Sequence, residues 1–373
     1  MCIRDSKIAL VKQEVYQDLY VCPVTEKDPG QILFSSMGRV GPIALMSDLN
    51  ADFYIVKEES NKETRIYQKV IPHIAPYLHL LKTETLDKIP GQEFKSPGSP
   101  YPNGKYAVSC YTIDWGQYDI VISINISLPT QLILKYPQTL FAYMIGEANM
   151  ATGKARFGYD ATLNQMARGR ISHKCGAIDF PYTFVAKDTL EKIMQQYLGR
   201  PSARKGIFME INSTTERPVT RIPDHFQPLA DAGYEIILHQ QKIADNLKNI
   251  YDAKYFVKMG GRSIRGNSVA EAVSLGTLAI MNRDEVIHHE LIIDECNVKT
   301  MDEMISLINR LENDPELYRT LQQKQRQVLH TYFFDAPLQS LINCLKEKRG
   351  LSKPRTYSRW NRLFDNLYFL KLR

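Results

Sequence analysis

The sequence lacks long apolar runs. In its 373 residues, no stretch reaches the roughly 18 uncharged apolar residues that a membrane-spanning helix needs, so we expect none. No apolar segment follows the first basic residues, and we expect no secretory signal. The six cysteines lie far apart without a CxxC pair, which argues against a disulfide scaffold or a zinc ribbon. Unpaired cysteines suit a reducing compartment, so the sequence predicts a cytoplasmic protein.

Motifs of metal and nucleophile chemistry are also missing. Neither DxD nor HExxH occurs, and the adjacent His288 and His289 lack the i, i+4 spacing that places two ligands on one helix face. We therefore expect no bound metal. No nucleophile elbow of the GxSxG type is present, which disfavours serine or cysteine nucleophiles.

Excess positive charge is confined to the C-terminus. Residues 346–373 carry nine Lys or Arg against two Asp or Glu, so this tail has a net charge of +7 and the other 345 residues sum to −1. A near-neutral body argues against nucleic-acid binding. In the tail, arginines surround apolar side chains at helical spacing, namely Trp360, Leu363, Phe364 and Leu367. This stripe favours packing on the protein itself; the alternative is a peripheral contact at the inner face of a membrane.

Short apolar, β-rich runs alternate with helical patterns along almost the whole chain, which is typical of parallel sheets covered by helices. We expect strands at residues 7–11, 32–35, 53–56, 119–124, 139–145, 161–163, 177–180, 206–211, 234–239, 255–259, 277–281 and 291–293. We expect helices at residues 63–83, 223–232, 243–253, 268–275 and 301–312. Thr300 and Glu303 form a capping box that begins the last of these helices.

A break in the pattern near residues 198–205 divides the chain, because Gly199 and Pro201 interrupt it there. The fold class that we expect is α/β, with two Rossmann-like domains facing a cleft and a helical C-terminus. The domains are residues 1–198 and 199–345, followed by a basic amphipathic tail at 346–373.

One segment has the features of a phosphate-binding loop. Residues 260–276 read GGRSIRGNSVAEAVSLG, follow an apolar strand and lead into a helix. Gly261 and Gly266 allow the backbone to turn tightly and to approach a ligand closely. A strand, a glycine loop and a helix N-terminus together predict a site for an anionic phosphate group.

Polar residues of the same segment support this prediction. Asn267 or Ser268 can cap the helix, and Arg262 and Arg265 carry guanidinium forks suited to phosphate oxygens. Asn267 stands where the motif GxxxxGK[ST] requires lysine, which argues against a nucleoside triphosphatase. The glycines are spaced wrongly for the dinucleotide motif GxGxxG, which argues against NAD.

The run of residues 266–281, GNSVAEAVSLGTLAIM, resembles the donor-binding element of group 1 GT-B glycosyltransferases and, more loosely, that of exostosin-like transferases. The resemblance implies that Glu271 holds the ribose of a nucleotide sugar. It implies that Gly266 and Asn267 lie beside the diphosphate and that Gly276 closes the helix. A nucleotide-diphosphate sugar is then the co-substrate, and no other cofactor is implied.

The sequence departs from this family at two positions. Retaining members carry an earlier glutamate at the position of Ser263, and exostosin-like members tend to have an arginine at the position of Ser268. Without the earlier glutamate, an inverting reaction is favoured. Glu271 also has an alternative role, because Ser268 and Glu271 have the spacing of a capping box.

Two other loops are expected to contribute. Residues 212–217, NSTTER, follow the strand at 206–211, so Arg217 can face the same ligand as the glycine–arginine segment. In the first domain, Gly38, Arg39 and Gly41 lie in a loop that resembles the glycine loop of GT-B N-terminal domains. A plain polar connection or turn is the alternative for each loop.

The candidate catalytic base is Glu147. It lies just beyond the strand at 139–145, where catalytic groups gather in parallel sheets. An inverting transferase needs a carboxylate or histidine to deprotonate the acceptor hydroxyl. Asp48 and Asp160 are secondary candidates, and an exposed or ion-paired carboxylate is the alternative for all three.

The sequence therefore predicts a metal-independent glycosyltransferase whose partners are a nucleotide sugar and a glycan or other hydroxyl acceptor. Two alternatives stay open. One is a non-catalytic nucleotide-sugar or glycan binding protein on the same fold. The other is an NAD-linked nucleotide-sugar modifying enzyme, although residues 12–15, after the first strand, contain no glycine.

Overall fold

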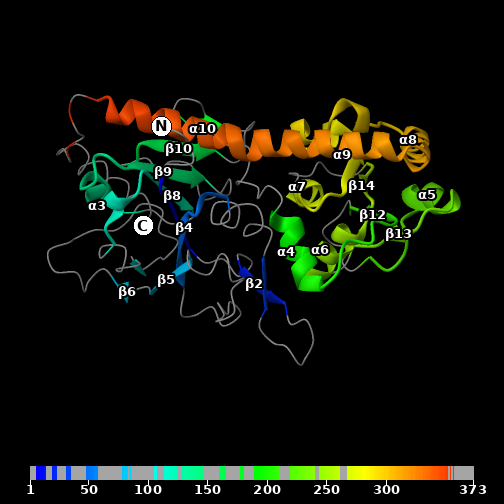
Figure 1. Ribbon diagram of the computed structural model, residues 1–373, viewed down its shortest axis with the longest axis horizontal. Coiled ribbons are helices and arrows are strands. Elements are labelled where there is room, and N and C mark those ends of the chain that lie inside the picture. The colour runs from blue at the N-terminus through cyan, green and yellow to red at the C-terminus, as the bar shows by residue number, and fades with distance from the viewer. Residues whose placement is uncertain are drawn as a thin grey trace, which may run out of the picture. The chain divides into compact units, whose positions relative to one another are not determined.

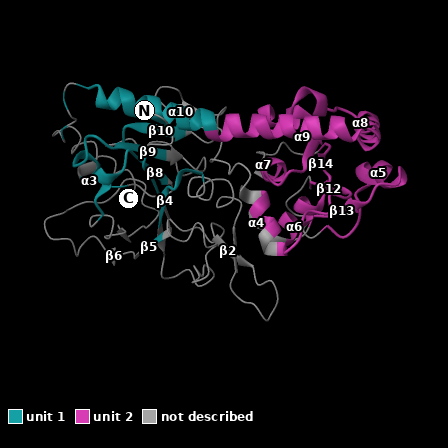
Figure 2. Ribbon diagram, in the orientation of Figure 1, with its two compact units in different colours: residues 1–32, 45–184, 335–373 teal, residues 33–44, 185–334 magenta. Residues whose placement is uncertain are grey.

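The computed structural model divides the chain into two compact units (Figure 2). Unit 1 consists of residues 1–32, 45–184 and 335–373, and unit 2 of residues 33–44 and 185–334. The sequence placed the boundary after residue 198, whereas here residues 185–198 belong to unit 2 and residues 335–345 to unit 1. The structure describes residues 6–13, 19–22, 31–34, 48–57, 78–82, 84–85, 105–106, 113–124, 128, 130–145, 159–164, 177–179, 189–210, 219–239, 243–260, 267–351, 353 and 356.

Unit 1 is built on a seven-stranded parallel sheet in the order β11-β10-β9-β8-β1-β4-β5 (Figure 1). Its strands are β1 (Ile8–Gln13), β4 (Asp52–Lys57), β5 (Leu78–Lys82), β8 (Ile120–Ile124), β9 (Leu140–Ile145), β10 (Ala161–Asn164) and β11 (Ala177–Asp179). The chain adds β4 and β5 on one side of β1 and then β8 to β11 on the other. The sheet is therefore doubly wound, which confirms the predicted α/β class.

The core of unit 1 lies against β1, β8 and β9. Val11, Val121 and Phe141 are fully buried there, and Trp115, in the 3₁₀ turn η5 (Trp115–Gln117), packs with them. Among the described residues of this unit, the helices are α3 (Thr130–Leu134) and α10 (Ala336–Arg349), and α10 contacts β9. Strands buried on both faces read as continuous apolar runs, which is why this part of the sheet was predictable.

One expectation for the first half of the chain needs correction. A helix was expected at residues 63–83, but residues 78–82 form β5, which pairs in parallel with β4. A short apolar run such as LHLL fits a buried helix or a buried strand, and only the pairing decides. The strand expected at 32–35 is β3 (Gln31–Phe34), which pairs with β2 (Leu19–Cys22) in a separate two-stranded sheet. A second small sheet joins β6 (Glu84–Thr85) and β7 (Lys105–Tyr106).

Unit 2 has a four-stranded parallel sheet in the order β13-β12-β14-β15. The strands are β12 (Ile207–Met209), β13 (Ile236–Ile237), β14 (Tyr255–Lys258) and β15 (Leu278–Met281). The helices are α4 (Thr189–Leu198), α5 (Gln227–Asp231), α6 (Ile243–Asp252), α7 (Asn267–Ser274), α8 (Met301–Asn313) and α9 (Pro315–His330). Every residue of β14 and β15 is buried, as in a sheet covered on both faces. The alternation of strands and helices predicted for this half is confirmed.

The outer edge of β15 differs from the prediction. Residues 291–293 were expected to form a strand, but the 3₁₀ turn η9 (His289–Leu291) lies there instead. The side chain of Gln325, from α9, holds this edge: its Oε1 accepts the N–H of Ala279 (2.8 Å), and its Nε2 donates to the carbonyls of Ala279 (3.0 Å) and Leu291 (3.2 Å). An amide side chain thus takes the hydrogen bonds that a further strand would have made.

The capping box predicted for α8 is confirmed. Thr300 accepts the N–H of Glu303 (3.2 Å), and the Glu303 carboxylate accepts the N–H of Thr300 (3.2 Å). These bonds satisfy two of the donors that a helix start leaves open. Among the described residues, every helix is too short or too polar to cross a membrane.

Candidate functional site

The carboxyl ends of β12 and β14 form the switch point of the sheet in unit 2. The chain places β13 on one side of β12 and then returns to place β14 on the other. Loops that follow two such strands diverge, and ligands of open α/β sheets bind in the crevice between them. The buried Glu210 follows β12 and donates its backbone N–H to Val257 of β14 (2.9 Å), while Gly260 follows β14.

A buried ion pair holds the backbone at this point. Lys258, the last residue of β14, has a fully buried side chain, and its Nζ lies 2.5 Å from Oε2 of Glu285, in the 3₁₀ turn η8 (Arg283–Glu285). The Lys258 ammonium also donates to the Gly260 carbonyl (2.7 Å), and Glu285 Oε1 accepts the Gly260 N–H (2.8 Å). Gly260 has a φ of +71°, a left-handed conformation that favours glycine.

Helix α7 follows as the next described element. It begins at Asn267, so Asn267 and Ser268 both lie within its first turn, and neither takes the capping position that was expected for one of them. The alternative role of Ser268 and Glu271 as a capping box is therefore also wrong. All residues from 269 to 275 are buried, and Glu271 is only 5% exposed.

The far end of α7 closes on a glycine, as the resemblance also implied. Gly276 has a φ of +80°, and its N–H bonds to the carbonyl of Val273 (3.0 Å). The N–H of Thr277 bonds to the carbonyl of Ala272 (2.8 Å). These two bonds define a Schellman motif, in which only a residue with a left-handed backbone ends the helix without strain.

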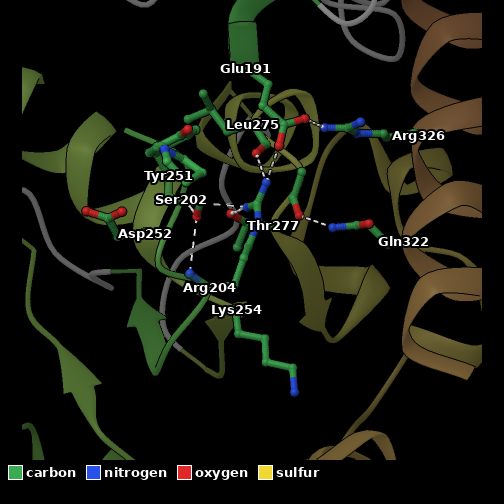
Figure 3. Close-up of polar contacts among 12 residues, drawn as sticks. Glu191, Ser202, Arg204, Tyr251, Asp252, Lys254, Leu275, Thr277, Gln322 and Arg326 are labelled. Carbon is green, nitrogen blue, oxygen red and sulfur yellow. Dashed lines mark hydrogen bonds and ion pairs between the residues drawn. The ribbon is translucent and has the colours of Figure 1, made fainter. Parts of the chain in front are cut away.

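A polar network surrounds this closing turn (Figure 3). Glu191 of α4 forms ion pairs with Arg204 (2.5 Å) and with Arg326 of α9. Arg204 also donates to the Leu275 carbonyl (2.6 Å) and to Thr277 Oγ1 (3.2 Å). The network ties α4 and α9 to the C-terminal end of α7, so this end of the helix is fixed by charge as well as by packing.

A second ion pair joins Arg200, which follows α4, to Asp252, the last residue of α6. Arg200 donates to both oxygens of Asp252 (2.7 and 2.5 Å), and the N–H of Ala203 donates to the same carboxylate (3.1 Å). Burial alone would raise the pKa of Asp252, but these hydrogen bonds outweigh it and lower the pKa below its ordinary value. The stability that Asp252 contributes is therefore present at neutral pH and is lost only when acid protonates it.

Most residues that the sequence nominated lie outside the described part of the chain. These are Gly38, Arg39, Gly41, Glu147, Arg217, Gly261, Arg262, Arg265 and Gly266. The structure describes Ser268, Glu271 and the backbone of Asn267, which share the first turns of α7. It brings together β14, Gly260 and α7 in the predicted order of strand, turn and helix.

Asp160, a secondary candidate for the catalytic base, has a structural role instead. Its side chain is 6% exposed, accepts the N–H of Phe141 (2.8 Å) and pairs with Lys348 Nζ (2.7 Å). Lys348 belongs to α10, so this ion pair docks α10 onto the sheet of unit 1. Asp160 precedes β10 and Asp48 precedes β4, which places both at the amino edge of the sheet, away from the strand ends where catalytic groups gather.

The histidines near residue 288 take part in packing and surface pairing. His288 is buried, and its ring lies 5.4 Å from that of Phe333 and 6.4 Å from that of Tyr332. His289 lies 3.4 Å from the Glu290 carboxylate. Within the part of the chain that the structure describes, no three His, Cys, Asp or Glu side chains gather in a way that could hold a metal ion.

Sequence analysis missed Lys258 and Glu285. The available signal was a lysine at the end of the otherwise apolar run YFVK, since a lysine is almost never fully buried without a partner. That signal predicts a buried partner for Lys258 but not which carboxylate it is. Glu285 lies 27 residues away in the sequence.

Comparison with known proteins gave structural likenesses only. No family model and no curated protein matches the chain. It is similar to the solved structure of sucrose-phosphate synthase from Thermosynechococcus elongatus, with 13% identity over 91% of this chain and 99% of that chain and a TM-score of 0.45. It is also similar to HepE from Anabaena in complex with UDP and glucose, with 10% identity over 93% of this chain and 100% of that chain and a TM-score of 0.42. A third similar structure is T4 phage β-glucosyltransferase, with 12% identity over 92% of this chain and 100% of that chain and a TM-score of 0.38. What defines the fold of this chain is its own strand order and helix placement.

Proposed function

We propose that the protein is a nucleotide-sugar-dependent glycosyltransferase that binds the donor diphosphate between the carboxyl end of β14 and the first turn of α7. One observation carries the proposal. At the switch point of the sheet in unit 2, Gly260 turns with a φ of +71° and a buried helix then begins at Asn267. A helix start at this place offers backbone N–H groups and a positive dipole end to an anion. The resemblance of residues 266–281 to GT-B donor elements supports a nucleotide-sugar diphosphate as that anion.

The charged residues of unit 2 have separate roles in this proposal. Glu271 holds the ribose hydroxyls, because a carboxylate accepts two hydrogen bonds from a diol. Arg217, Arg262 and Arg265 neutralise the diphosphate as it leaves, and such fixed charges stabilise a transition state without a metal. The proposed reaction is therefore metal-independent, and the missing earlier glutamate at Ser263 favours inversion.

The N-terminal domain supplies the acceptor side of the reaction in this proposal. Glu147 follows β9 and acts as the base that deprotonates the acceptor hydroxyl during attack on the anomeric carbon. The loop with Gly38, Arg39 and Gly41 approaches the donor. The basic tail at 346–373 contacts the protein itself or the inner face of a membrane.

Donor binding tests the proposal directly. We expect one nucleotide among UDP, GDP, ADP and dTDP, or the corresponding sugar, to raise the thermal midpoint of the purified chain. A ligand at 100 times its Kd stabilises a protein by about 2.7 kcal/mol, which for a unit of this size corresponds to a rise of roughly 5–10 °C. EDTA should leave this rise unchanged, since no metal takes part in the proposed site. NAD⁺, included in the same panel, should give no rise.

Two variants on one turn of α7 separate a ribose contact from the loss of any polar side chain at this end of the helix. Glu271→Gln should weaken nucleotide binding about tenfold, because it removes the charged acceptor of the ribose hydroxyls. Ser268→Ala keeps that acceptor and should bind as the parent protein does. A panel in which no nucleotide shifts the midpoint would rule out the proposed function. A shift without sugar transfer to any acceptor would favour the non-catalytic binding protein.

A further inference from the structure

The carbonyl and the N–H of Gly260 are each hydrogen-bonded to a charged side chain. The Lys258 ammonium bonds to its carbonyl (2.7 Å), the Glu285 carboxylate bonds to its N–H (2.8 Å), and the two charges pair with each other (2.5 Å). The three groups form a closed cycle that joins the end of β14 to η8. Hydrogen bonds to ionised groups are shorter and stronger than those between neutral groups, so the cycle fixes the backbone firmly.

We propose that the Lys258–Glu285 pair is a positioning element of the donor site. It fixes the Gly260 backbone at the carboxyl end of β14, which forms one side of the proposed donor site. The inference rests on the function proposed above and adds two residues that act on the donor through the Gly260 backbone. Neither needs to touch the ligand, because Lys258 is fully buried and both oxygens of Glu285 are engaged.

The charges of the pair suit a site for an anion. Glu285 supplies the acceptor that the Gly260 N–H needs, but a lone carboxylate beside a diphosphate would repel it. Lys258 cancels that repulsion by pairing with one oxygen of Glu285, and the other oxygen accepts the Gly260 N–H. A buried ion pair adds little stability over an apolar pair of similar volume, so its value here lies in the geometry that it imposes.

Two double variants of the full chain test this inference without leaving a buried lone charge. Lys258→Met with Glu285→Leu removes all bonds to Gly260. Lys258→Met with Glu285→Gln is also uncharged but keeps an acceptor for the Gly260 N–H. As a matched control, Glu191→Gln weakens the network at the opposite end of α7 and touches neither Gly260 nor the helix start. The measurements are the Kd for UDP, GDP, ADP and dTDP by calorimetry and the rate of amide hydrogen exchange at Gly260.

The apolar double variant should bind the nucleotide that the parent protein binds about tenfold more weakly, with faster exchange at Gly260. The Met/Gln variant should regain part of this affinity, and Glu191→Gln should bind like the parent protein even though it is less stable. If the Lys258–Glu285 pair only stabilised the fold, the nucleotide affinities of the variants would follow their stabilities. The two double variants would then not differ in affinity in this way.

Two results would overturn the inference, and they are distinguishable. If the parent protein binds a nucleotide and both double variants bind it equally well, the pair does not position the site, while the proposed function stands. If the parent protein binds none of UDP, GDP, ADP and dTDP, the proposed function fails, and the donor-site role of the pair fails with it.

Discussion

Replacing Lys258 by methionine, with Glu285 left in place, is expected to lower the free energy of unfolding of unit 2 by about 3–5 kcal/mol. Methionine matches the length of the lysine stem, so the change removes the charge with little change in packing. The loss arises because the Glu285 carboxylate, 16% exposed, is left without its counter-charge. The measurement is a denaturant titration, in which the midpoint should fall while the slope stays constant.

The same substitution at an exposed ion pair is the matched control. Lys324 lies 2.5 Å from Glu295, but their side chains are 49% and 37% exposed. Lys324→Met should therefore cost at most about 1 kcal/mol, since water screens the pair. Equal losses at Lys258 and Lys324 would contradict the buried environment described for the first pair. Adding Glu285→Leu to Lys258→Met should restore most of the lost stability.

Replacing Gly276 by alanine is expected to lower the free energy of unfolding by about 2–4 kcal/mol, from backbone strain and from disrupted ion pairs together. An added Cβ would lie 2.6 Å from Nη2 of Arg326 and closer still to Nη2 of Arg204. Both guanidinium groups are paired with Glu191, so they cannot move aside without weakening those pairs. The backbone contributes as well, because a φ of +80° disfavours any residue with a Cβ.

Gly233 offers the control for backbone strain alone. Its φ is +89°, and an added Cβ would meet no atom within 4 Å. Gly233→Ala should therefore cost only about 1–2 kcal/mol, the penalty of a left-handed backbone. Thermal or chemical denaturation of the two variants side by side measures the difference. If both variants lose the same stability, the guanidinium network does not constrain the space around Gly276.

The apolar pattern predicted most strands of both sheets because parallel strands covered on two faces need continuous apolar runs. The run LAIM of β15 is an example. The prediction was wrong at residues 78–82 and 291–293, where short apolar runs fit more than one structure. Pairing with β4 decides the first case, and the side chain of Gln325 decides the second. Both depend on residues distant in the sequence.

The candidate site was predictable to the extent that its signals are local. Glycines after an apolar strand predict a turn and a helix start within a few residues, and Glu271 was nominated from the resemblance of residues 266–281 to GT-B donor elements. The Lys258–Glu285 pair joins residues 27 apart, and the Asp160–Lys348 pair joins residues 188 apart. Which carboxylate meets which lysine depends on the completed fold, so Asp160 looked like a catalytic candidate until the structure placed α10 beside it.

The edge strand β15 of the four-stranded sheet in unit 2 has a consequence for self-association. Gln325 engages the amide and the carbonyl of Ala279, and the carbonyl of Met281 accepts the N–H of Val298 (3.2 Å). An extended peptide, or the same strand of a second molecule, would find these groups already taken. Edge-to-edge aggregation through β15 is therefore blocked by the chain's own side chains and backbone.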